Sequence, residues 1–586
     1  MKKILISIAS LMLFASLALS QTMADALTYS QTNYYGTART LGMGNAVTAI
    51  GGDLGTIAIN PAGGAVSYYS QFAFSSGWTT SRSSSAYAPS FDSYDGSANY
   101  TGGFDNAKTR MTIPNVGVNM CFETGNRTGV LSWNFGFLVN RNQTFTRIMS
   151  ASGLEGHTTM TGALATNANG MPGDILANKD KYDSRYPWNS IVAYDGGLIN
   201  FNSDAGNYYG SAETKKLTGT QYNYEMLGWL KQNIGTTAVG SRNDMIINYG
   251  ANIDDRLFIG ASLNCPIIEY RYSEFYSETA QDPADFPVTP EYWDSKTDAY
   301  VQGPATNYLS STYKYDYAAS ISGVNLKLGF IWLPTDGLRI GAAFQTPTAL
   351  TIEEQWYVDV SSEFKDASQN VKAYTPTAES EYNFRSPYSA NFGLAYTIGR
   401  IGLFSVDYEI ADFSVMKFSE PYVDATYSYE DPFYRVNRLN KLFCGVQHSL
   451  RAGVEFRVMP SLSLRAGINM ATSPERYYVD NEGYIVYAAD YDRWFNEYEA
   501  GTYTLETRDY THDRTSSWSL GAGYSSPGSF YADFAIRKTT LPNSYYSAYS
   551  NYLSHTVGGK VYDIVSPSVK SSYSLFDAVF TIGWRF

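Results

Sequence analysis

The chain contains few of the side chains that carry catalysis or hold metals. Its 586 residues include four histidines and three cysteines, the latter being Cys121, Cys265 and Cys444. An odd number of cysteines at wide spacing gives neither a disulfide framework nor a metal-binding pattern. The histidines do not form a catalytic triad in the sequence, although lipid hydrolysis through His512 or His555 stays an alternative. We therefore predict no metal, no cofactor and no enzyme activity.

The sequence also lacks an excess of positive charge and a membrane-length apolar run. The formal net charge is -13, which makes nucleic acid a poor partner. Beyond the N-terminus, no apolar run reaches the roughly 18 residues that a membrane-spanning helix needs. A membrane β-barrel does not need such a run, because its apolar residues alternate with polar ones along each strand.

The N-terminus has the pattern of a secretory signal. Lys2 and Lys3 provide positive charge, and an apolar stretch follows from Ile4 to Leu19. Small residues allow cleavage after Ser20 or after Ala26. We predict that residues 1–26 are a signal peptide, with cleavage after residue 20 or 26.

Aromatic residues are abundant. They make up 16% of the chain and include 51 tyrosines. Such an excess is typical of the aromatic girdles of membrane barrels and of loops that face sugars or lipids. A tyrosine-rich extracellular β-sandwich has the same composition, so composition alone leaves both open.

The last segment of the chain shows the clearest alternation. Phe576, Phe580 and Trp584 share one face of an extended strand, whereas Asp577 and Thr581 share the other. In a barrel the first set meets lipid and the second faces the lumen. Similar patterns predict fourteen strands: 67–80, 111–122, 128–140, 242–253, 256–274, 314–333, 337–359, 382–398, 401–417, 442–458, 461–474, 515–525, 529–540 and 572–586.

The connections between these strands alternate between short and long. Asp254-Asp255-Arg256 and Gly399-Arg400 are short, whereas about a hundred polar residues follow Asn140. Tight turns at one end and long loops at the other are typical of outer-membrane barrels. We predict an all-β fold, a fourteen-stranded antiparallel transmembrane β-barrel over residues 67–586, with both chain ends on the periplasmic side and the long loops outside.

Residues 27–66 do not alternate and are rich in small side chains. Either they form a flexible periplasmic tail or they fill the barrel lumen as a plug. We favour the plug, because Leu41, Val47 and Ile57 would be poorly placed in a free tail. We call residues 27–66 the hatch segment.

A family resemblance rests on this segment. Arg39-Thr40-Leu41-Gly42-Met43-Gly44-Asn45-Ala46, followed by Asn60-Pro61-Ala62-Gly63, resembles the N-terminal hatch of the FadL/TodX family of outer-membrane transporters for long-chain fatty acids and other hydrophobic molecules. Ile113 to Val118 and Gly453 to Pro474 are also similar to that family. The resemblance implies a fourteen-stranded monomeric barrel, capture between extracellular loops and sideways release near the hatch. It assigns hatch roles to Gly42, Met43, Gly44, Asn60, Pro61 and Ala62.

Two groups of side chains are candidates for binding substrate. In the run from Tyr222 to Lys231, a helix would place Tyr222, Met226, Trp229 and Leu230 on one apolar face, which forms either a capture surface or a packing contact between loops. By strand parity, three arginines face the lumen and either meet a substrate carboxylate or pair with acids such as Glu455 and Asp407. These arginines are Arg451, Arg457 and Arg465.

Besides lipid hydrolysis, two functions remain open at this point. The first is passive transport of hydrophobic compounds, such as long-chain fatty acids, through the outer membrane of a Gram-negative bacterium. The second is a surface adhesion barrel whose loops bind glycans or proteins. The first predicts outer-membrane lipid, lipopolysaccharide and a hydrophobic small molecule as partners, and it alone gives the hatch segment a purpose.

Overall fold

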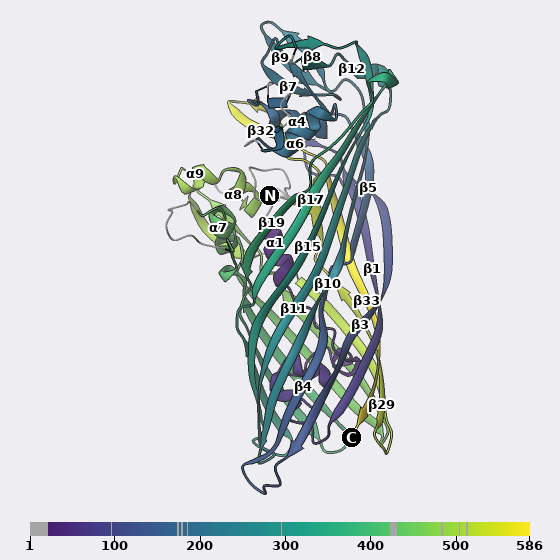
Figure 1. Cartoon of the computed structure of the whole chain (residues 1–586), viewed down its shortest axis with the longest axis vertical. Coiled ribbons are helices and arrows are strands. Elements are labelled where there is room, and N and C mark those ends of the chain that lie inside the picture. Colours follow the sequence, from purple (N-terminus) through teal and green to yellow (C-terminus); the bar gives the residue numbers. More distant parts are fainter. Residues whose placement is uncertain are drawn as a thin grey trace.

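The computed structural model of the chain describes residues 22–94, 96–172, 175–176, 180–183, 186–294, 296–421, 431–481, 485–502, 504–510 and 514–586. Residues 1–21 of the predicted signal peptide therefore lie outside the described residues, whereas residues 22–26 lie within them. Within them the chain forms one closed barrel crowned by folded loops (Figure 1).

Fourteen antiparallel strands close the barrel, as predicted. Closure comes from β33, which pairs with β29 on one side and with β1 on the other. Every predicted strand segment overlaps one of the fourteen, and several strands extend beyond their predicted bounds. They are β1 (Gln71–Ala88), β3 (Thr101–Glu123), β4 (Val130–Thr144), β10 (Leu230–Ile253), β11 (Leu257–Ala280), β15 (Thr306–Trp332), β16 (Leu338–Gln345), β20 (Ser389–Ile398), β21 (Gly402–Asp412), β23 (Val446–Met459), β24 (Leu462–Thr472), β28 (Arg514–Ser525), β29 (Phe530–Thr540) and β33 (Ser568–Arg585).

Four of these strands continue after a break near the long-loop end. The breaks before β17 and β20 contain Pro347 and Pro387, which have no backbone N–H to donate to a neighbouring strand. The break before β5 lies at Phe145 and Thr146. The four continuations are β5 (Arg147–Glu155), β17 (Ala349–Phe364), β19 (Ala378–Arg385) and β22 (Lys417–Ser419).

Side-chain alternation follows the predicted faces. On β33, Phe576, Phe580 and Trp584 are exposed on the outer wall, whereas Asp577 and Thr581 are fully buried on the lumen side. A pleated strand presents successive side chains to opposite faces, so a wall one strand thick sorts them into lipid-facing and lumen-facing sets.

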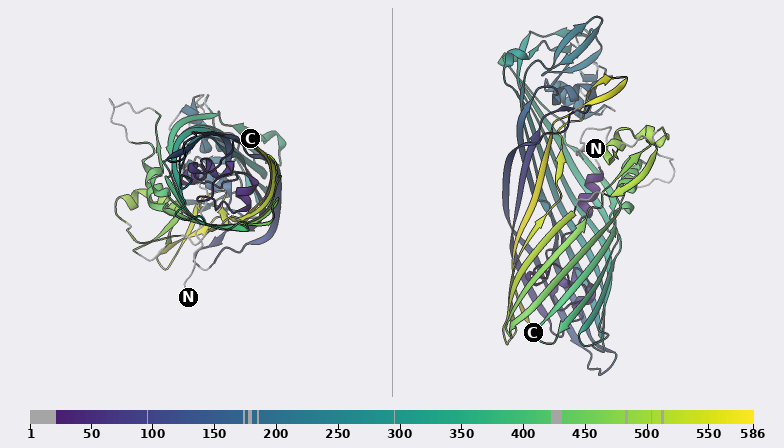
Figure 2. Two further views of the ribbon diagram at one scale, coloured as in Figure 1. Left: turned by 90° about the horizontal axis from the view of Figure 1, so that it is seen from below. Right: turned by 180° about the vertical axis from the view of Figure 1, so that it is seen from behind.

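The two ends of the barrel differ as expected, but the two chain ends do not both lie where they were predicted. Short turns lie at one end together with the C-terminus, and the long loops form a head at the other end (Figures 1 and 2). The prediction of two periplasmic chain ends is wrong for the described N-terminus. Helix α1 (Met23–Ser30) lies toward the long-loop end, where it packs against α7 (Tyr434–Phe443).

The hatch segment lies inside the barrel, as Figure 2 shows in the view along the axis. After α1 it forms three short helices, each with a side-chain cap at its first turn. The capping residues are Thr37, Asp53 and Asn60. The helices are α2 (Ala38–Gly42), α3 (Leu54–Ile57) and η1 (Pro61–Gly64).

The loops carry the remaining elements. None of the helices in the described part of the chain has the length and apolar character needed to cross a membrane. These elements are β2 (Phe91–Asp92), α4 (Met160–Ala168), η2 (Lys181–Asp183), α6 (Trp188–Asp195), β6 (Ile199–Asn202), β7 (Asn207–Gly210), β8 (Thr214–Thr218), β9 (Gln221–Glu225), η3 (Pro283–Asp285), β12 (Pro287–Val288), β13 (Glu291–Asp294), β14 (Ala299–Gln302), η4 (Ala367–Gln369), β18 (Val371–Tyr374), η5 (Phe413–Val415), α7, β25 (Arg476–Asp480), β26 (Ile485–Val486), α8 (Ala488–Arg493), α9 (Phe495–Glu499), β27 (Leu505–Tyr510), β30 (Ser544–Tyr546), β31 (Leu553–Val557) and β32 (Lys560–Val565).

The predicted helix from Tyr222 to Lys231 is wrong. Residues Gln221–Glu225 form β9, which pairs with β8 in a hairpin, and Leu230 already begins β10. Tyr222 and Tyr224 also fit a period of two, and Gly219 at the turn has a φ of 66°. The pattern of apolar residues here fits both a helix and a strand. The segment forms a strand because β8 offers it backbone hydrogen-bond partners across this turn.

Candidate functional site

A large cavity lies between the hatch segment and the loops at the mouth of the barrel. Its volume is about 1820 Å³, and we call it the mouth cavity. The wall strands β11, β15 and β17 contribute Tyr270, Tyr315, Tyr317 and Trp356 to its lining. Loops and the N-terminal helix also contribute apolar lining, including Met23, Leu27, Trp188, Val436, Leu439 and Tyr546.

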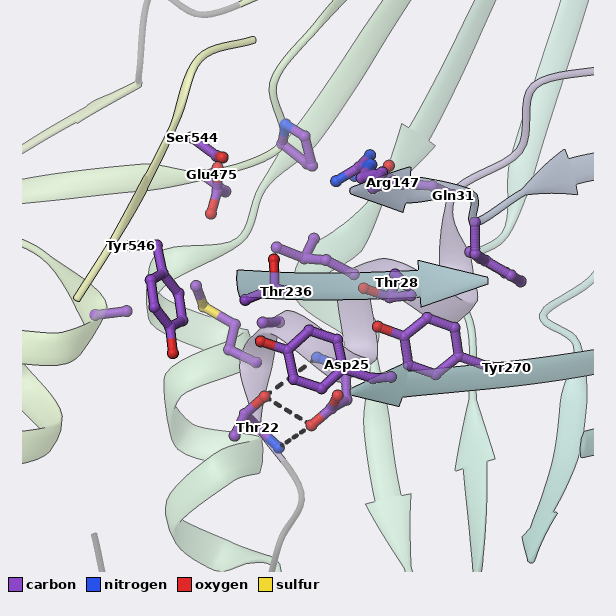
Figure 3. Close-up of a pocket in the computed structure, with 18 of the residues that line it drawn as sticks. Thr22, Asp25, Thr28, Gln31, Arg147, Thr236, Tyr270, Glu475, Ser544 and Tyr546 are labelled. Atoms are coloured by element: carbon purple, nitrogen blue, oxygen red, sulfur yellow. Dashed lines mark hydrogen bonds between the residues drawn. The ribbon is translucent and has the colours of Figure 1, made fainter. Parts of the chain in front are cut away.

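Helix α1 lines the mouth cavity and is held in place at its first turn. The Thr22 hydroxyl donates to the Asp25 carboxylate at 2.7 Å, and the Asp25 backbone N–H donates to the Thr22 hydroxyl oxygen at 3.2 Å. Figure 3 shows this reciprocal cap beside the ring of Tyr270. Further along the helix, the hydroxyls of Tyr29 and Tyr317 share a hydrogen bond of 2.7 Å. Burial raises the pKa of Asp25 to about 6, against the hydrogen bonds from Thr22.

Ion pairs hold the hatch segment against one side of the lumen. Arg39 donates to Glu455 at 3.0 Å, and Glu455 also accepts from Arg465 at 2.6 Å. Arg465 also pairs with Asp533. The strands that supply these partners, β23, β24 and β29, therefore hold α2 through a continuous network of charges.

The resemblance motif makes close backbone contacts with wall glycines. A Cβ atom at Gly467 would overlap the backbone at Gly44, and one at Gly453 would overlap the Met43 carbonyl. On the opposite side, a Cβ atom at Gly260 would overlap Pro61 and Ala62. Glycines on the lumen face thus let the hatch segment approach the wall closely, which explains their placement on the polar parity of these strands.

Asn60 joins the hatch segment to itself and to the wall. Its amide donates to the Thr48 carbonyl at 2.7 Å and to the Phe330 carbonyl at 3.1 Å, and its Oδ1 accepts from the Ala62 backbone N–H at 3.0 Å. One side chain therefore ties the two halves of the segment and strand β15 together.

The three predicted lumen arginines lie in different surroundings. Arg451 lines the mouth cavity, pairs with Glu409 and lies 5.5 Å from the centre of the Tyr34 ring. Arg465 belongs to the network of charges that holds the hatch segment and pairs with Glu455. This is the second of the two roles given above for these arginines, pairing with an acid. Arg457 is exposed near a short turn and does not line the cavity.

The four predicted capture residues do not line the mouth cavity. Tyr222 donates to Asp204 at 2.9 Å, and Met226 packs against a loop cluster that contains the buried Leu230. Trp229 is 53% exposed on the outside of the loops. The residues that do line it, Tyr270 and Tyr313 to Tyr317 among them, carried a signal, because tyrosines recur with a period of two at the outer ends of β11 and β15.

The barrel wall is interrupted next to the cavity. Strand β3 pairs with β4 only as far as Asn115 opposite Asn140, and β5 pairs only with β10. The outer half of β3 therefore pairs with β1 alone. Hydrogen bonds bridge the gap from Asn106 to Ser150 at 2.9 Å and from Ser83 to the Ile148 carbonyl at 2.5 Å. At its outer end the backbone N–H and the hydroxyl of Ser90 donate to the Glu155 carboxylate. We call this gap the seam; residues 143–147 beside it line the mouth cavity.

A buried carboxyl in the loop head gives a pH prediction. Glu213 accepts from the Gly210 backbone N–H at 2.8 Å and from the Tyr552 hydroxyl at 3.1 Å, and burial raises its pKa from 4.5 to about 7. The folded loop head therefore binds the carboxyl proton of Glu213 more tightly than the unfolded loops do. For this reason the free energy of unfolding of the head falls by about 3 kcal/mol in all as the pH rises from 4.5 to 7. Limited proteolysis of the loops should therefore be slower at pH 5 than at pH 8. In Glu213→Gln this difference should shrink; an unchanged difference would assign it to another group.

Among the described residues, no group of three or more metal-ligating side chains is placed to hold a metal ion.

No family model matches the chain, and no curated protein matches it. Solved structures do match. They include a FadL homologue of Pseudomonas aeruginosa at 12% identity, with a TM-score of 0.43 and coverage of 94% of this chain and 99% of the other.

Two further matches are toluene transporters. They are TodX of Pseudomonas putida, at 12% identity with a TM-score of 0.40, and TbuX of Ralstonia pickettii, at 14% identity with a TM-score of 0.38. Each alignment covers 94% of this chain and 98% of the other. The chain resembles FadL-type channels.

Proposed function

We propose that the protein carries hydrophobic compounds passively through the outer membrane of a Gram-negative bacterium. The observation that carries this proposal is the mouth cavity, which lies above the hatch segment and reaches the seam in the wall. Outer-membrane lipid and lipopolysaccharide surround a monomeric barrel in this proposal. Dilution of the compound on the far side drives net flow.

Capture takes place at the mouth cavity in this proposal. Rings of Tyr270, Tyr315 and Trp356 offer apolar area to a compound that arrives between the loops. Burying apolar surface contributes about 25 cal/mol per Å², so a compound of modest size gains several kcal/mol on leaving water. Long-chain fatty acids fit if their carboxylate meets Arg147, whose side chain also lines the cavity.

Release is lateral in this proposal, since the axial route is more firmly closed than the seam. Moving the hatch segment would break the pairs of Arg39 and Glu455 together with the backbone contacts at the wall glycines. Opening the seam breaks only the hydrogen bonds of Asn106, Ser83 and Ser90 instead. A hydrophobic compound also gains by passing directly from the cavity into lipid without crossing the wet lumen.

A disulfide across the seam tests this route. Asn106→Cys with Ser150→Cys places two thiols where side chains already meet at 2.9 Å. In cells that express the oxidised protein, we expect uptake of a radiolabelled long-chain fatty acid to fall to the level of cells without the protein, and to recover after reduction. Toluene uptake should be measured in parallel, because the two compounds separate substrate classes.

The matched control removes a residue that was predicted to capture substrate. Trp229→Ala changes an exposed side chain outside the cavity and should leave uptake unchanged. Full uptake through the oxidised seam would contradict lateral release. Equal uptake with and without the protein, together with lost cell adhesion, would support the second function, a barrel whose exposed loop residues such as Trp229 and Leu217 bind a surface partner.

A further inference from the structure

Three rows of lumen-facing residues cross the wall strands β1, β3, β4 and β10 below the mouth cavity. The register of these strands places each row side by side. The upper row is Ser75, Asn115, Asn140 and Asp244; the middle row is Ala73, Gly117, Leu138 and Ile246; the lower row is Gln71, Asn119, Gly136 and Asn248. Two polar rows thus enclose one apolar row.

The lower row contains buried polar atoms without a partner among the described residues. They are Nε2 of Gln71, Oδ1 of Asn119 and both amide atoms of Asn248, and each of these side chains is at most 2% exposed. Ser262, which pairs with Asn248 on β11, has an unpartnered hydroxyl as well. An unsatisfied buried polar group costs about 1–3 kcal/mol, so a row of them is stable only if water satisfies it.

The upper row is polar and leads toward the mouth cavity. Asn115 donates to Asn140 at 3.1 Å, Asn140 to Asn142 at 2.7 Å, and Asn142 to Asp244 at 2.6 Å. Oδ1 of Asn115 is again unpartnered. Gln143, which follows Asn142 on β4, lines the mouth cavity, so the upper row ends beside that cavity.

The middle row separates the two polar rows. Leu138, Ile246 and Ala73 are at most 2% exposed, and they pack against Leu54 and Ile57 of the hatch segment in one cluster. On β11 the same row continues as Asn264, whose amide donates to Asn325 at 2.8 Å, so the apolar row ends there. In the lower row the Lys327 ammonium, beside Ser262, donates to the Ala58 carbonyl at 2.6 Å. A single apolar layer between two wet regions excludes water by dewetting.

We propose that Ala73, Leu138 and Ile246 of the wall form a hydrophobic gate together with Leu54 and Ile57 of the hatch segment. The gate closes a water path between the hatch segment and the wall of strands β1, β3, β4 and β10, which we call the β1–β10 wall. Water occupies the polar rows on both sides of the gate, and ions do not pass while the apolar row is intact. The neighbouring strand β33 needs no such gate, because Thr581, which pairs with Ser75, accepts from the Ala38 backbone N–H of the hatch segment at 2.8 Å. The gate is separate from the route proposed for hydrophobic compounds.

Polar substitution of the gate tests the proposal. Leu138→Asn keeps the side-chain size and makes the middle row wettable. In planar bilayers that hold the full-length variant, we expect an ion conductance about tenfold or more above that of the wild type, because a hydrated layer no longer blocks ions by dewetting. Ile57→Asn changes the same layer from the hatch side and should give a similar increase. Fatty acid uptake through the seam should be unchanged in both variants.

The matched control is Val579→Asn on β33. Val579 packs against Ala38 and Leu41 of the hatch segment, and it lies on the neighbouring strand β33, where Thr581 is paired with the hatch backbone. Its conductance should stay at the wild-type level. An equal rise in Val579→Asn would mean general loosening and would overturn the gate, as would a wild type that already conducts as well as Leu138→Asn. If Leu138→Asn does not fold, Leu138→Ala, which opens the layer without a polar group, must raise conductance for the gate to stand.

Discussion

Replacing Asp577 with asparagine is expected to lower the free energy of unfolding by about 3–5 kcal/mol, the usual cost of leaving a buried charge without its partner. Asp577 accepts from Arg537 at 3.0 Å and from the Thr79 hydroxyl at 2.7 Å, and the Asp577 and Arg537 side chains are 0% and 2% exposed. Arg537 also donates to the Tyr34 carbonyl at 2.9 Å, so its unpaired charge would disturb the hatch segment as well. Denaturant unfolding in detergent micelles, followed by tryptophan fluorescence, measures the change.

Two controls make this expectation specific. Glu225→Gln breaks an exposed pair with Lys216 and should change stability by at most about 0.5 kcal/mol. The double variant Arg537→Met with Asp577→Leu replaces the pair by apolar side chains of similar size and should recover most of the loss. A loss for Asp577→Asn no larger than that for Glu225→Gln would show that the pair carries little of the stability.

Deleting residues 27–66 is expected to raise nonspecific permeability by a large factor. The segment is buried throughout the lumen, and without it the polar faces of the strands would line a water-filled bore. Swelling of proteoliposomes in small sugars, compared with liposomes that hold the intact protein, measures this change.

The deletion also separates the plug from the gate. Removing the segment opens both walls of the lumen, whereas Leu138→Asn opens the β1–β10 side alone. Unchanged sugar permeability in a deletion variant that still shows the heat-dependent gel mobility of a folded barrel would contradict the plug. Sugar permeability through Leu138→Asn equal to that of the deletion would show that the gate variant displaces the whole segment.

The strands could be predicted from the sequence because a barrel wall is one strand thick. Each residue faces either lipid or lumen, so the alternation of Phe580 with Thr581 reports the fold directly. Pro347 and Pro387 in the sequence also indicate the breaks within two long strands, although the predicted segments 337–359 and 382–398 run through them as continuous strands. Helix α7 was missed although Val436, Leu439 and Phe443 recur at helical spacing on its buried face.

The candidate site was only partly predictable. The motif around Gly42 and Asn60 identified the segment that enters the lumen, yet its partners in the wall lie hundreds of residues away, as Arg39 does from Glu455. The capture helix at Tyr222 failed because a short amphipathic run fits a strand as well as a helix, and the neighbouring strand decides between them.

Local alternation, turn length and the small-residue segment by themselves determined that this chain is a fourteen-stranded barrel with its N-terminal part inside. These are properties of neighbours along the chain. Which residues surround the mouth cavity, where β3 parts from β4, and which row on the wall is apolar were decided only when strands far apart in sequence came into register. Burial and pairing across strands depend on that register, and a period of two repeats without fixing it.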